Sequence, residues 1–421
     1  MRLAEIFERV VGASAPVGFR AYDGSTAGDP DSDVALVVRT PVALNYLAQA
    51  PGALGLTRAY VSGHLDLEGD MYTALQRMSE ITFGEGITPR EFARIVRDIG
   101  WVKLVNRVPP PPQEVRRSRL FGLGARHSKG RDAEAIHHHY DVSNAFYELV
   151  LGPSMTYTCA VYPAADASLE QAQFHKYELV ARKLGLAEGM RLLDVGCGWG
   201  GMVIHAAREY GVKALGVTLS KEQAEWAQKR IAQEGLGDLA EVRHMDYRDV
   251  PDGVYDRISS IGLTEHIGMR NVPDYFASLH AKLKPGGRLL NHCITRPRND
   301  LPPRVPGGVI NRYVFPDGEL EGPGWLQAKM NDAGFEIHHQ ENLRDHYALT
   351  LRDWGANLDR NWDAAVREVG EGTARVWRLY MAGCVLGFER NVVQLHQILG
   401  VKLDGTDAGM PLRPDFEPSA R

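Results

Sequence analysis

The chain has 421 residues, of which 44% are hydrophobic, and its formal net charge is −5. This length exceeds one typical domain and predicts two, while the negative charge argues against nucleic acid as a partner. No apolar run reaches the ~20 residues that span a bilayer, no secretory leader is expected, and the four scattered cysteines suit a reducing cytoplasm.

The amino-terminal residues 1–100 are predicted to form a small α+β domain. Residues 1–11 place apolar side chains at helical spacing, residues 34–39 form an apolar run typical of a strand, and residues 42–48 look helical. Composition alone indicates no role for this domain.

Residues 101–135 are predicted to form a basic linker that contains the proline run 109–112. Between residues 103 and 131 a single acid, Glu114, stands among the basic residues Lys103, Arg107, Arg116, Arg117, Arg119, Arg126, Lys129 and Arg131. The segment is either a solvated interdomain linker or a membrane-binding segment. In the second case each Lys or Arg gains about 1 kcal/mol from anionic head groups.

A glycine turn between a strand and a helix predicts a ligand site. The apolar strand 190–195 leads into Gly196 and Gly198, and a helix is expected over 201–210. Glycine lets the backbone approach a ligand where a Cβ would collide, and the helix N-terminus offers free N–H groups beside it. A ligand with a sugar and a zwitterionic tail would suit this place.

Polar residues follow the next two predicted strands. Strand 213–218 ends at Thr218, where a dinucleotide site would place an acid to bind the ribose, so an ordinary NAD site is disfavoured. Strand 240–244 is followed by Asp246 and Tyr247, an acid and an aromatic that could hold an adenine.

The remaining elements continue the alternation of strands and helices. We expect a strand over 254–261, a helix over 272–283, a turn over 284–287, a strand over 288–294 and a helical cap around 377–389. This order predicts an α/β fold with a doubly wound parallel sheet, whose ligands bind at the carboxyl ends of the strands.

The histidines at positions 137–139 do not predict a metal site. Consecutive side chains point in different directions, and no cysteine or carboxylate completes a ligand set at a recognised spacing. We therefore expect no bound metal.

Six motifs in chain order resemble the cyclopropane-fatty-acyl-phospholipid synthase family of class I S-adenosylmethionine-dependent methyltransferases. They read HYDVSN from His139, MTYTCA from Met155, VTLS from Val217, EHIG from Glu265, NRYVFP from Asn311 and HYALTL from His346. The resemblance implies a Rossmann-like methyltransferase domain with a helical lid over residues 136–403, followed by a mobile tail, 404–421. Longer members of the family carry a small amino-terminal domain, which is proposed to take up lipid or to dimerise.

The resemblance implies a reaction on an unsaturated acyl chain of a membrane phospholipid. S-adenosylmethionine (SAM) provides a methyl group for the cis double bond, and a bound bicarbonate then removes a proton from the resulting carbocation. Aromatic faces stabilise such a cation without a lone pair that would trap it. The aromatic candidates are Trp199, Tyr157, Tyr347 and the substrate-lining pair Tyr313 and Phe315.

The family's bicarbonate-binding pattern maps onto Cys159, Glu265, His292, the backbone of Ile294, and Tyr347. Taken singly, a buried cysteine, a core histidine and a packed tyrosine have ordinary structural roles. All the expected residue types at the family's spacing favour the functional interpretation.

The cofactor contacts implied by the resemblance follow the strand ends. Tyr157, Thr158, Gly196 and Gly198 would contact the amino-acid moiety, Thr218, Leu219 and Gln223 the ribose, and Asp246, Tyr247 and Arg248 the adenine. The Tyr247-Arg248 pair departs from the Trp-Glu pair that is frequent in related mycolic-acid enzymes.

A second departure concerns the product. The family usually has an aromatic residue just before Glu265, where this chain has Leu263 and Thr264. Some actinobacterial relatives make a methylene-branched chain, which a flavin-dependent reductase partner converts to a 10-methyl (tuberculostearic) acid. We favour this product, with ring closure to a cyclopropane as the alternative.

Two hypotheses from other classes stay open. A lipid-binding relative without catalysis would not need the intact site residues, and a methyltransferase acting on an oxygen or nitrogen nucleophile would need no anion-held base. The favoured hypothesis places the protein in the cytoplasm, peripherally associated with the inner face of the membrane. It leaves homo-oligomer formation open.

Overall fold

The computed structural model describes residues 1–12, 15–81, 107–115, 142–304, 309–315 and 317–417, together with residues 88, 90, 94 and 97. The chain divides into two compact units. The smaller unit comprises Met1–Arg117, Pro306–Val314 and Trp362–Leu386, and the larger unit comprises the rest. Most of the predicted basic linker and the histidines 137–139 lie outside the described residues.

The smaller unit has an α+β fold, as predicted for the amino-terminal region, but it also takes in two later segments of the chain. Its four-stranded sheet has the order β2-β1-β3-β4, in which β1 and β3 are parallel and the other pairs antiparallel. Its elements are α1 (Leu3–Val11), β1 (Gly18–Ala21), β2 (Thr26–Gly28), β3 (Ala35–Val38), α2 (Val42–Gln49), α3 (Ala53–Val61), β4 (Leu65–Glu68), α4 (Met71–Met78), α15 (Ile310–Tyr313), α18 (Trp362–Val369) and residues 371–386 of α19 (Glu371–Glu389).

Part of the predicted linker is a packed component of the smaller unit. Glu114 is buried and accepts two hydrogen bonds of 2.7 Å from the Arg58 guanidinium. It also accepts bonds from Arg312 at 3.2 Å and from the Tyr313 hydroxyl at 3.1 Å. Burial alone would raise the pKa of the Glu114 carboxyl, but these bonds hold that pKa below its ordinary value.

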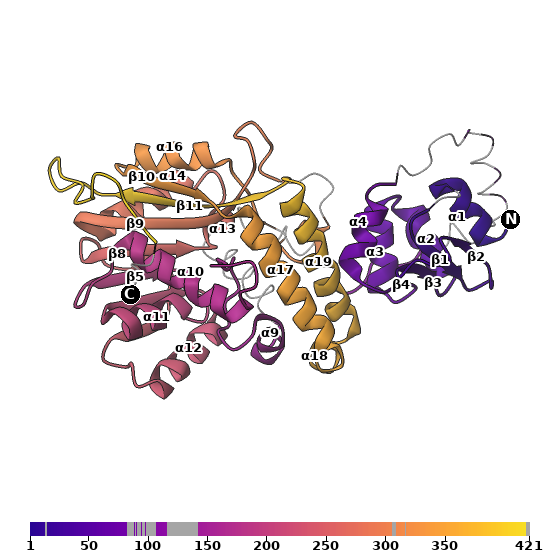
Figure 1. The fold of residues 1–421 in the computed structure, drawn as a ribbon, viewed down its shortest axis with the longest axis horizontal. Coiled ribbons are helices and arrows are strands. Elements are labelled where there is room, and N and C mark those ends of the chain that lie inside the picture. The colour runs from indigo at the N-terminus through magenta and orange to yellow at the C-terminus, as the bar shows by residue number, and fades with distance from the viewer. Residues whose placement is uncertain are drawn as a thin grey trace. The chain divides into compact units, whose positions relative to one another are not determined.

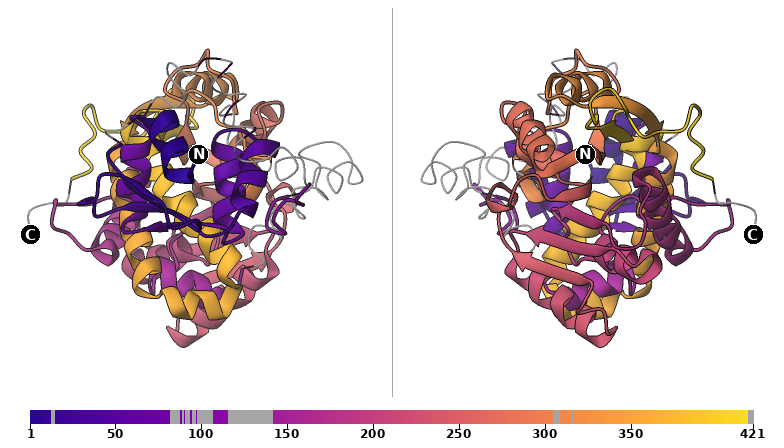
Figure 2. Two further views of the ribbon diagram at one scale, coloured as in Figure 1. Left: turned by 90° about the vertical axis from the view of Figure 1, so that its right-hand side faces the viewer. Right: turned by 90° about the vertical axis from the view of Figure 1, so that its left-hand side faces the viewer.

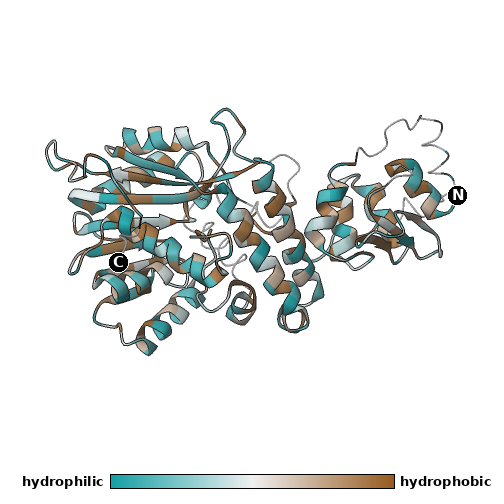
Figure 3. Ribbon diagram, viewed as in Figure 1, coloured by the Kyte–Doolittle hydropathy of each residue, from teal (hydrophilic) through white to brown (hydrophobic). Residues whose placement is uncertain are grey.

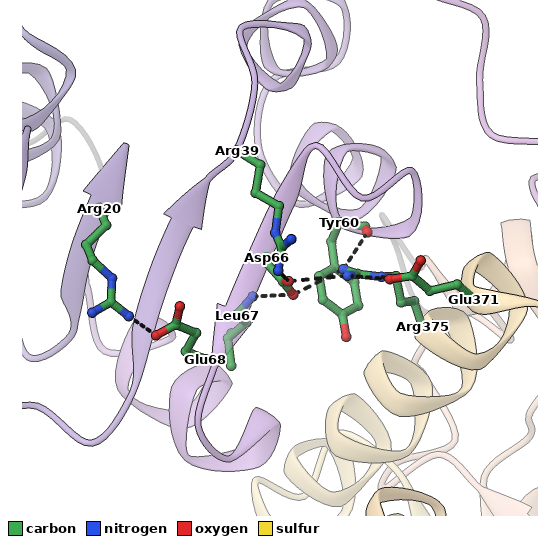
Figure 4. A network of polar contacts seen from close by, with 8 residues as sticks. All are labelled: Arg20, Arg39, Tyr60, Asp66, Leu67, Glu68, Glu371 and Arg375. Carbon is green, nitrogen blue, oxygen red and sulfur yellow. Dashed lines mark hydrogen bonds and ion pairs between the residues drawn. The ribbon is translucent and has the colours of Figure 1, made fainter. Parts of the chain in front are cut away.

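A buried arginine connects the sheet of the smaller unit to helix α19. Arg375 donates to both carboxylate oxygens of Asp66 on β4, at 3.1 and 3.3 Å, and to Tyr60 O at 3.2 Å (Figure 4). It also donates to Glu371 Oε1 at 2.8 Å. Asp66 has a second partner in Arg39, which is exposed. Arg375 is therefore the main buried partner of the Asp66 carboxylate.

The larger unit is built on a seven-stranded sheet of order β10-β11-β9-β8-β5-β6-β7 (Figure 1). The strands β9, β8, β5, β6 and β7 pair in parallel, while β11 is antiparallel to both of its neighbours. The elements are α9 (Asn144–Leu151), α10 (Leu169–Leu184), β5 (Arg191–Val195), α11 (Gly201–Tyr210), β6 (Lys213–Thr218), α12 (Lys221–Gln233), β7 (Ala240–His244), the 3-10 turn η1 (Tyr247–Asp249), β8 (Tyr255–Ile261), α13 (Thr264–Ile267), α14 (Val272–Lys282), β9 (Leu283–Thr295), α16 (Pro323–Asp332), β10 (Glu336–Asn342), α17 (Arg344–Arg360) and β11 (Gln394–Val401).

Helices cover both faces of this sheet, which confirms the predicted doubly wound fold (Figure 2). Helices α10, α11 and α12 pack on one face, where Leu192 and Leu290 are buried. Helices α14 and α16 pack on the other, where Leu193 and Leu289 are buried. Successive residues of a strand point to opposite faces, so strands buried on both sides must be apolar almost throughout. Figure 3 shows hydrophobic stretches along the strands and a mixed colouring of the helices.

The predicted turn over residues 284–287 is wrong in part, because the strand begins earlier, at Leu283. The register between β8 and β9 shifts between the pairs Tyr255/Leu283 and Arg257/Arg288, so the turn residues form an irregularity inside β9. Residues Gly286 and Gly287 stay in the sheet because they bond to Lys402, just after β11, at 2.8 Å each.

Within the described residues, no helix combines the length and the apolar composition that a bilayer span requires.

Arg375→Ala is expected to destabilise the smaller unit by about 2 to 4 kcal/mol, because Asp66 would stay charged after losing its main buried partner. Urea unfolding followed by circular dichroism measures the change. Arg367→Ala, which removes an exposed arginine from α18, is the control and should change the unfolding free energy by less than about 0.5 kcal/mol. Equal effects of the two substitutions would contradict this interpretation of the contact.

Candidate active site

The glycine turn after β5 leaves open space beside its backbone. Gly196 and Gly198 have φ angles of 72° and 54°, which favour glycine. The N–H groups of Gly196 and Cys197 both donate to Val217 O, which fixes the turn against β6. A Cβ at Gly198 would meet no atom within 4 Å. The turn therefore presents bare backbone to a ligand just before α11 begins at Gly201.

The predicted ribose residues lie together at the end of β6. Thr218 and Gln223 are buried, and the Thr218 hydroxyl donates to Gln223 Oε1 at 2.9 Å. The Thr218 hydroxyl also accepts a bond from the Ser220 N–H at 3.2 Å, and Leu219 O is 3.1 Å from His244 Nε2 on β7. These contacts hold the strand end in one conformation next to the glycine turn.

The predicted adenine residues form one compact group after β7. Asp246 accepts a two-pronged bond from the Arg248 guanidinium at 2.7 and 2.5 Å. The Arg248 guanidinium carbon lies 5.5 Å from the centre of the Tyr247 ring, and that ring packs edge-on against Tyr275 at 5.1 Å. Asp246 is thus held by Arg248, which limits its freedom to bind an adenine directly.

A buried lysine that was not predicted from the sequence contacts one of the predicted cofactor residues. Lys176 on α10 is 1% exposed and donates to the Thr158 hydroxyl at 3.2 Å. Burial lowers the pKa of Lys176 to about 7 and raises the pKa of Asp194, at the end of β5, to about 7. Asp194 accepts a bond from the Ser259 hydroxyl at 2.6 Å. The signal in the sequence was a lysine among the apolar positions that α10 buries.

The residues after β8 contact both the glycine turn and the loop that carries Thr158. A Cβ on Gly196 would lie 3.1 Å from the Leu263 side chain, and one on Gly262 would lie 3.0 Å from the Thr158 methyl group. The Thr264 hydroxyl donates to Asn291 Oδ1 on β9 at 2.7 Å. The ends of β5, β8 and β9 therefore meet at one place.

Glu265 lies where these strand ends meet. It lies on the short helix α13 and is buried, and its Oε1 accepts a 2.6 Å bond from the Ile294 N–H on β9. Burial raises the pKa of Glu265 to about 7, although the Ile294 bond acts in the opposite direction. The backbone N–H of Ile294, which was predicted to contact the anion, therefore donates to Glu265 in this structure.

His292 lies two residues before Ile294 on the same strand and is 1% exposed. Its Nδ1 is 3.1 Å from Gln397 Nε2. Burial and the nearby lysine charges, Lys176 and Lys183, keep the pKa of the imidazole well below its ordinary value, so the ring is neutral.

Among the described residues, Glu265 Oε2 and His292 Nε2 are buried and have no hydrogen-bond partner. A buried polar atom without a partner costs on the order of 1 to 3 kcal/mol, so each one calls for an explanation such as a bound water, a bound ion or a catalytic role. A carboxylate oxygen accepts hydrogen bonds and an imidazole nitrogen donates or accepts one, so each of these atoms can bind a small polar ligand.

Cys159 and Tyr347 come from two other segments. Cys159 is fully buried, its thiol lies 3.1 Å from Ala160 O, and burial raises its pKa, so the thiol stays protonated. The next N–H, that of Ala160, donates to the Thr350 hydroxyl on α17, the helix that carries Tyr347. This bond links the Cys159 loop to α17.

A continuous row of aromatic rings joins the glycine turn to Tyr347. The distances between successive ring centres are 4.8 Å for Trp199 and Tyr147, 5.7 Å for Tyr147 and Tyr157, 5.4 Å for Tyr157 and Trp354, and 6.1 Å for Trp354 and Tyr347. Three of the predicted aromatic residues therefore fall in one row. Tyr147 and Trp354 were missed, because nothing in their local sequence separates them from core aromatics.

The two predicted substrate-lining residues fall in different units. The Phe315 ring lies 5.4 Å from the ring of His266, next to Glu265, in the larger unit. Tyr313 belongs to the smaller unit, where its hydroxyl binds Glu114.

No group of three His, Cys, Asp or Glu side chains suited to a metal ion occurs within the described residues.

Comparison with known proteins places this site in a family. Residues 127–398 match the family described as mycolic acid cyclopropane synthetase. A probable fatty acid methyltransferase of Mycobacterium tuberculosis is 55% identical over 425 residues, which cover 99% of each chain. The cyclopropane-fatty-acyl-phospholipid synthase of Escherichia coli K12 is 33% identical over 352 residues, which cover 83% of each chain.

A solved structure agrees with these sequence matches. The mycolic acid cyclopropane synthase CmaA1, complexed with SAH and CTAB, has a TM-score of 0.60 and 33% identity over 64% of this chain and 97% of that chain. The family match spans the glycine turn, the strand ends and the region around Glu265 and His292. The chain therefore belongs to the cyclopropane synthase family of S-adenosylmethionine-dependent methyltransferases.

Proposed function

We propose that this enzyme transfers a methyl group from SAM to the cis double bond of an unsaturated acyl chain in a phospholipid. The observation that carries the proposal is the pair of unpartnered buried atoms, Glu265 Oε2 and His292 Nε2, in the same unit as the aromatic row. A methyl transfer to oxygen or nitrogen needs no anion-held base. The names of the Mycobacterium tuberculosis and Escherichia coli relatives support fatty acyl and phospholipid chemistry.

The glycine turn suits SAM, which when bound supplies an electrophilic methyl group. The space at Gly198 would admit the amino-acid moiety, and the first N–H groups of α11 would face its carboxylate. Thr218 and Gln223 would bind the ribose, and Tyr247 would pack on the adenine. In this proposal Lys176 holds Thr158 in position through its hydrogen bond to the Thr158 hydroxyl.

We infer that Glu265 and His292 hold a bicarbonate ion, which would serve as the base. Bicarbonate carries one O–H donor and several acceptor oxygens. It would therefore donate to Glu265 Oε2 and accept from His292 Nε2, which satisfies both unpartnered atoms. The protonated thiol of Cys159 and the Tyr347 hydroxyl would add donors at this site.

The aromatic row would keep water out and stabilise positive charge on the acyl chain. The faces of Tyr157, Trp354 and Tyr347 attract a cation but offer it no ring lone pair. Trp354 and Tyr347 are buried and Tyr157 is half-buried, which matters because water that reached the cation would quench it.

We favour a methylene-branched product because of the two residues before Glu265. Leu263 packs against the glycine turn, and the Thr264 hydroxyl is turned to Asn291. Neither side chain gives the cation an aromatic face at this position. The proton would then be lost from the acyl chain or the new methyl group in a way that leaves an alkene for a flavin-dependent reductase partner.

We further propose that the enzyme works in the cytoplasm at the membrane surface, where the basic residues of segment 103–131 would meet anionic head groups. The smaller unit would assist lipid uptake or dimerisation.

Gly198→Ala should weaken SAM binding by about tenfold or more, because the new methyl group would occupy the space left for the ligand. Isothermal titration calorimetry measures the dissociation constant. Gly189→Ala is a matched control, since Gly189 also has a positive φ and open space at its Cβ position but lies in the turn before β5. Both variants should lose similar stability, and only Gly198→Ala should lose affinity. Unchanged affinity in Gly198→Ala would remove the glycine turn from the cofactor site.

Glu265→Gln should lower kcat for methyl transfer to oleoyl phospholipid by about 100-fold or more, because the amide cannot accept a proton or hold the anion as a carboxylate does. The dissociation constant for SAM should not change. Glu225→Gln, which removes an exposed carboxylate from α12, is the control and should keep full activity. A fully active Glu265→Gln variant would show that the base site is elsewhere.

We expect the Glu265→Gln variant to be more stable than wild type at high pH. A loss of activity in this variant would then not result from unfolding. The folded pKa of Glu265 is about 7 against an ordinary 4.5, so the folded protein binds more protons between these values and wild type loses stability as pH rises through them. The neutral amide avoids this loss. Urea unfolding should show equal stability at pH 4.5 and a gain of about 1 to 3 kcal/mol at pH 8.

The product should be a methylene-branched chain. Purified enzyme, SAM, bicarbonate and vesicles of oleoyl phospholipid are incubated, and the fatty acids are derivatised and identified by mass spectrometry. A gain of one CH₂ with the alkene retained is the expected result. The same gain without an alkene would mean ring closure, and no gain would favour a non-catalytic lipid binder or another substrate.

A further inference from the structure

The two ring nitrogens of His292 have different surroundings. Nε2 is buried without a partner among the described residues, while Nδ1 lies 3.1 Å from Gln397 Nε2. Gln397 is directly opposite His292 in the antiparallel pair of β9 and β11, and both side chains are essentially inaccessible to solvent. The contact is therefore set by the sheet register.

The orientation of the Gln397 amide follows from its second partner. Gln397 Oε1 lies 2.7 Å from the ammonium group of Lys183 on α10. An ammonium group only donates hydrogen bonds, so the amide oxygen must face it. A flipped amide would place its NH₂ group against the ammonium, with two donors facing each other.

Lys183 is itself held in place. It is fully buried, and its ammonium also pairs with Glu341 on β10, whose side chain is 37% exposed. Burial lowers the pKa of Lys183, and Glu341 acts in the opposite direction by stabilising the charge. The chain of contacts thus runs from Glu341 near the surface, through Lys183 and Gln397, to His292.

The protonation of His292 follows from this chain. The amide NH₂ group of Gln397 can only donate, so Nδ1 of His292 must accept and carry no hydrogen. Since the ring is neutral, its one hydrogen is on Nε2.

We propose that Lys183 and Gln397 are positioning residues that fix His292 in the Nε2–H tautomer. This inference rests on the proposed function in one respect, because the Nε2–H group is then a donor to the anion held with Glu265. His292 in this tautomer cannot take a proton at Nε2. The bound anion takes the proton from the acyl chain, and His292 only orients that anion.

Nitrogen-15 NMR of protein labelled in histidine tests the tautomer without lipid, SAM or turnover. Long-range correlations distinguish a protonated ring nitrogen from an unprotonated one, and the His292 signals are assigned by their loss in His292→Gln. Wild type should show Nε2 protonated and Nδ1 unprotonated. A ring protonated on Nδ1, or on both nitrogens, in wild type at pH 7 would overturn the proposal.

Gln397→Glu should reverse the pattern, because its carboxylate accepts from Lys183 and from a hydrogen on Nδ1. The variant should then show Nδ1 protonated, alone or together with Nε2. Gln397→Met tests the same contact without a new charge and should give a mixture of the two tautomers. If both variants fold and keep only the Nε2–H tautomer, Gln397 does not set it and the proposal is wrong.

Activity separates this inference from the proposed function. Gln397→Met should lower kcat on the order of tenfold with unchanged affinity for SAM, as is usual when the partner that orients a site histidine is lost. Gln394→Met, on the same strand but half-buried and bonded to Asn391 instead of His292, should keep full activity and the wild-type tautomer. The expected tautomer in an enzyme that modifies no acyl chain would refute the proposed function alone. The opposite tautomer in an active enzyme would refute this inference alone.

Discussion

The 2.6 Å hydrogen bond from the Ile294 N–H to Glu265 is the contact on which the rest of the site depends. It draws a buried carboxylate from α13 onto β9, which lies between β8 and β11, and satisfies one of its oxygens. The other oxygen keeps no partner among the described residues, and the proposed anion would bind there. Because burial also raises the pKa of Glu265, the site changes its charge near neutral pH. The oxygens of an exposed carboxylate would be hydrogen-bonded to water, and its pKa would not be raised by burial.

The antiparallel strand β11 gives this site its second constraint. Inserted between β10 and β9, it places Gln397 opposite His292, and Gln397 reaches the buried Lys183 on α10. The sheet therefore fixes the Nδ1 side of the imidazole, while Glu265 is anchored to Ile294 on the same strand, β9. The aromatic row, which extends from the glycine turn to Tyr347, would supply the apolar wall of the proposed site. In the proposed reaction, side chains fixed through backbone packing would serve the methyl donor, the cation and the base.

The sequence predicted those parts of the structure that depend on local pattern. The strand and helix around the glycine turn were predicted correctly, because an apolar run and the glycines that follow it determine the local backbone conformation. Helix α11 covers Gly201–Tyr210 as expected. The positions of Lys183 and Gln397 were not foreseen, since their contact joins residues 214 positions apart through the register of β11. Lys176 was missed for the same reason, because its burial depends on the packing of α10 against the sheet. Glu265 and His292 were named only through the resemblance to a family, and the unpartnered atoms became visible in the structure.

The dependence of the reaction on bicarbonate tests the central claim most directly. Methyl transfer to oleoyl phospholipid is measured in buffer freed of carbon dioxide, with and without added bicarbonate, for wild type and for Glu265→Gln. If Glu265 and His292 hold the base, wild type should be nearly inactive without bicarbonate and recover as it is added, while the variant should not respond. A wild-type rate that is the same in both buffers would contradict the account.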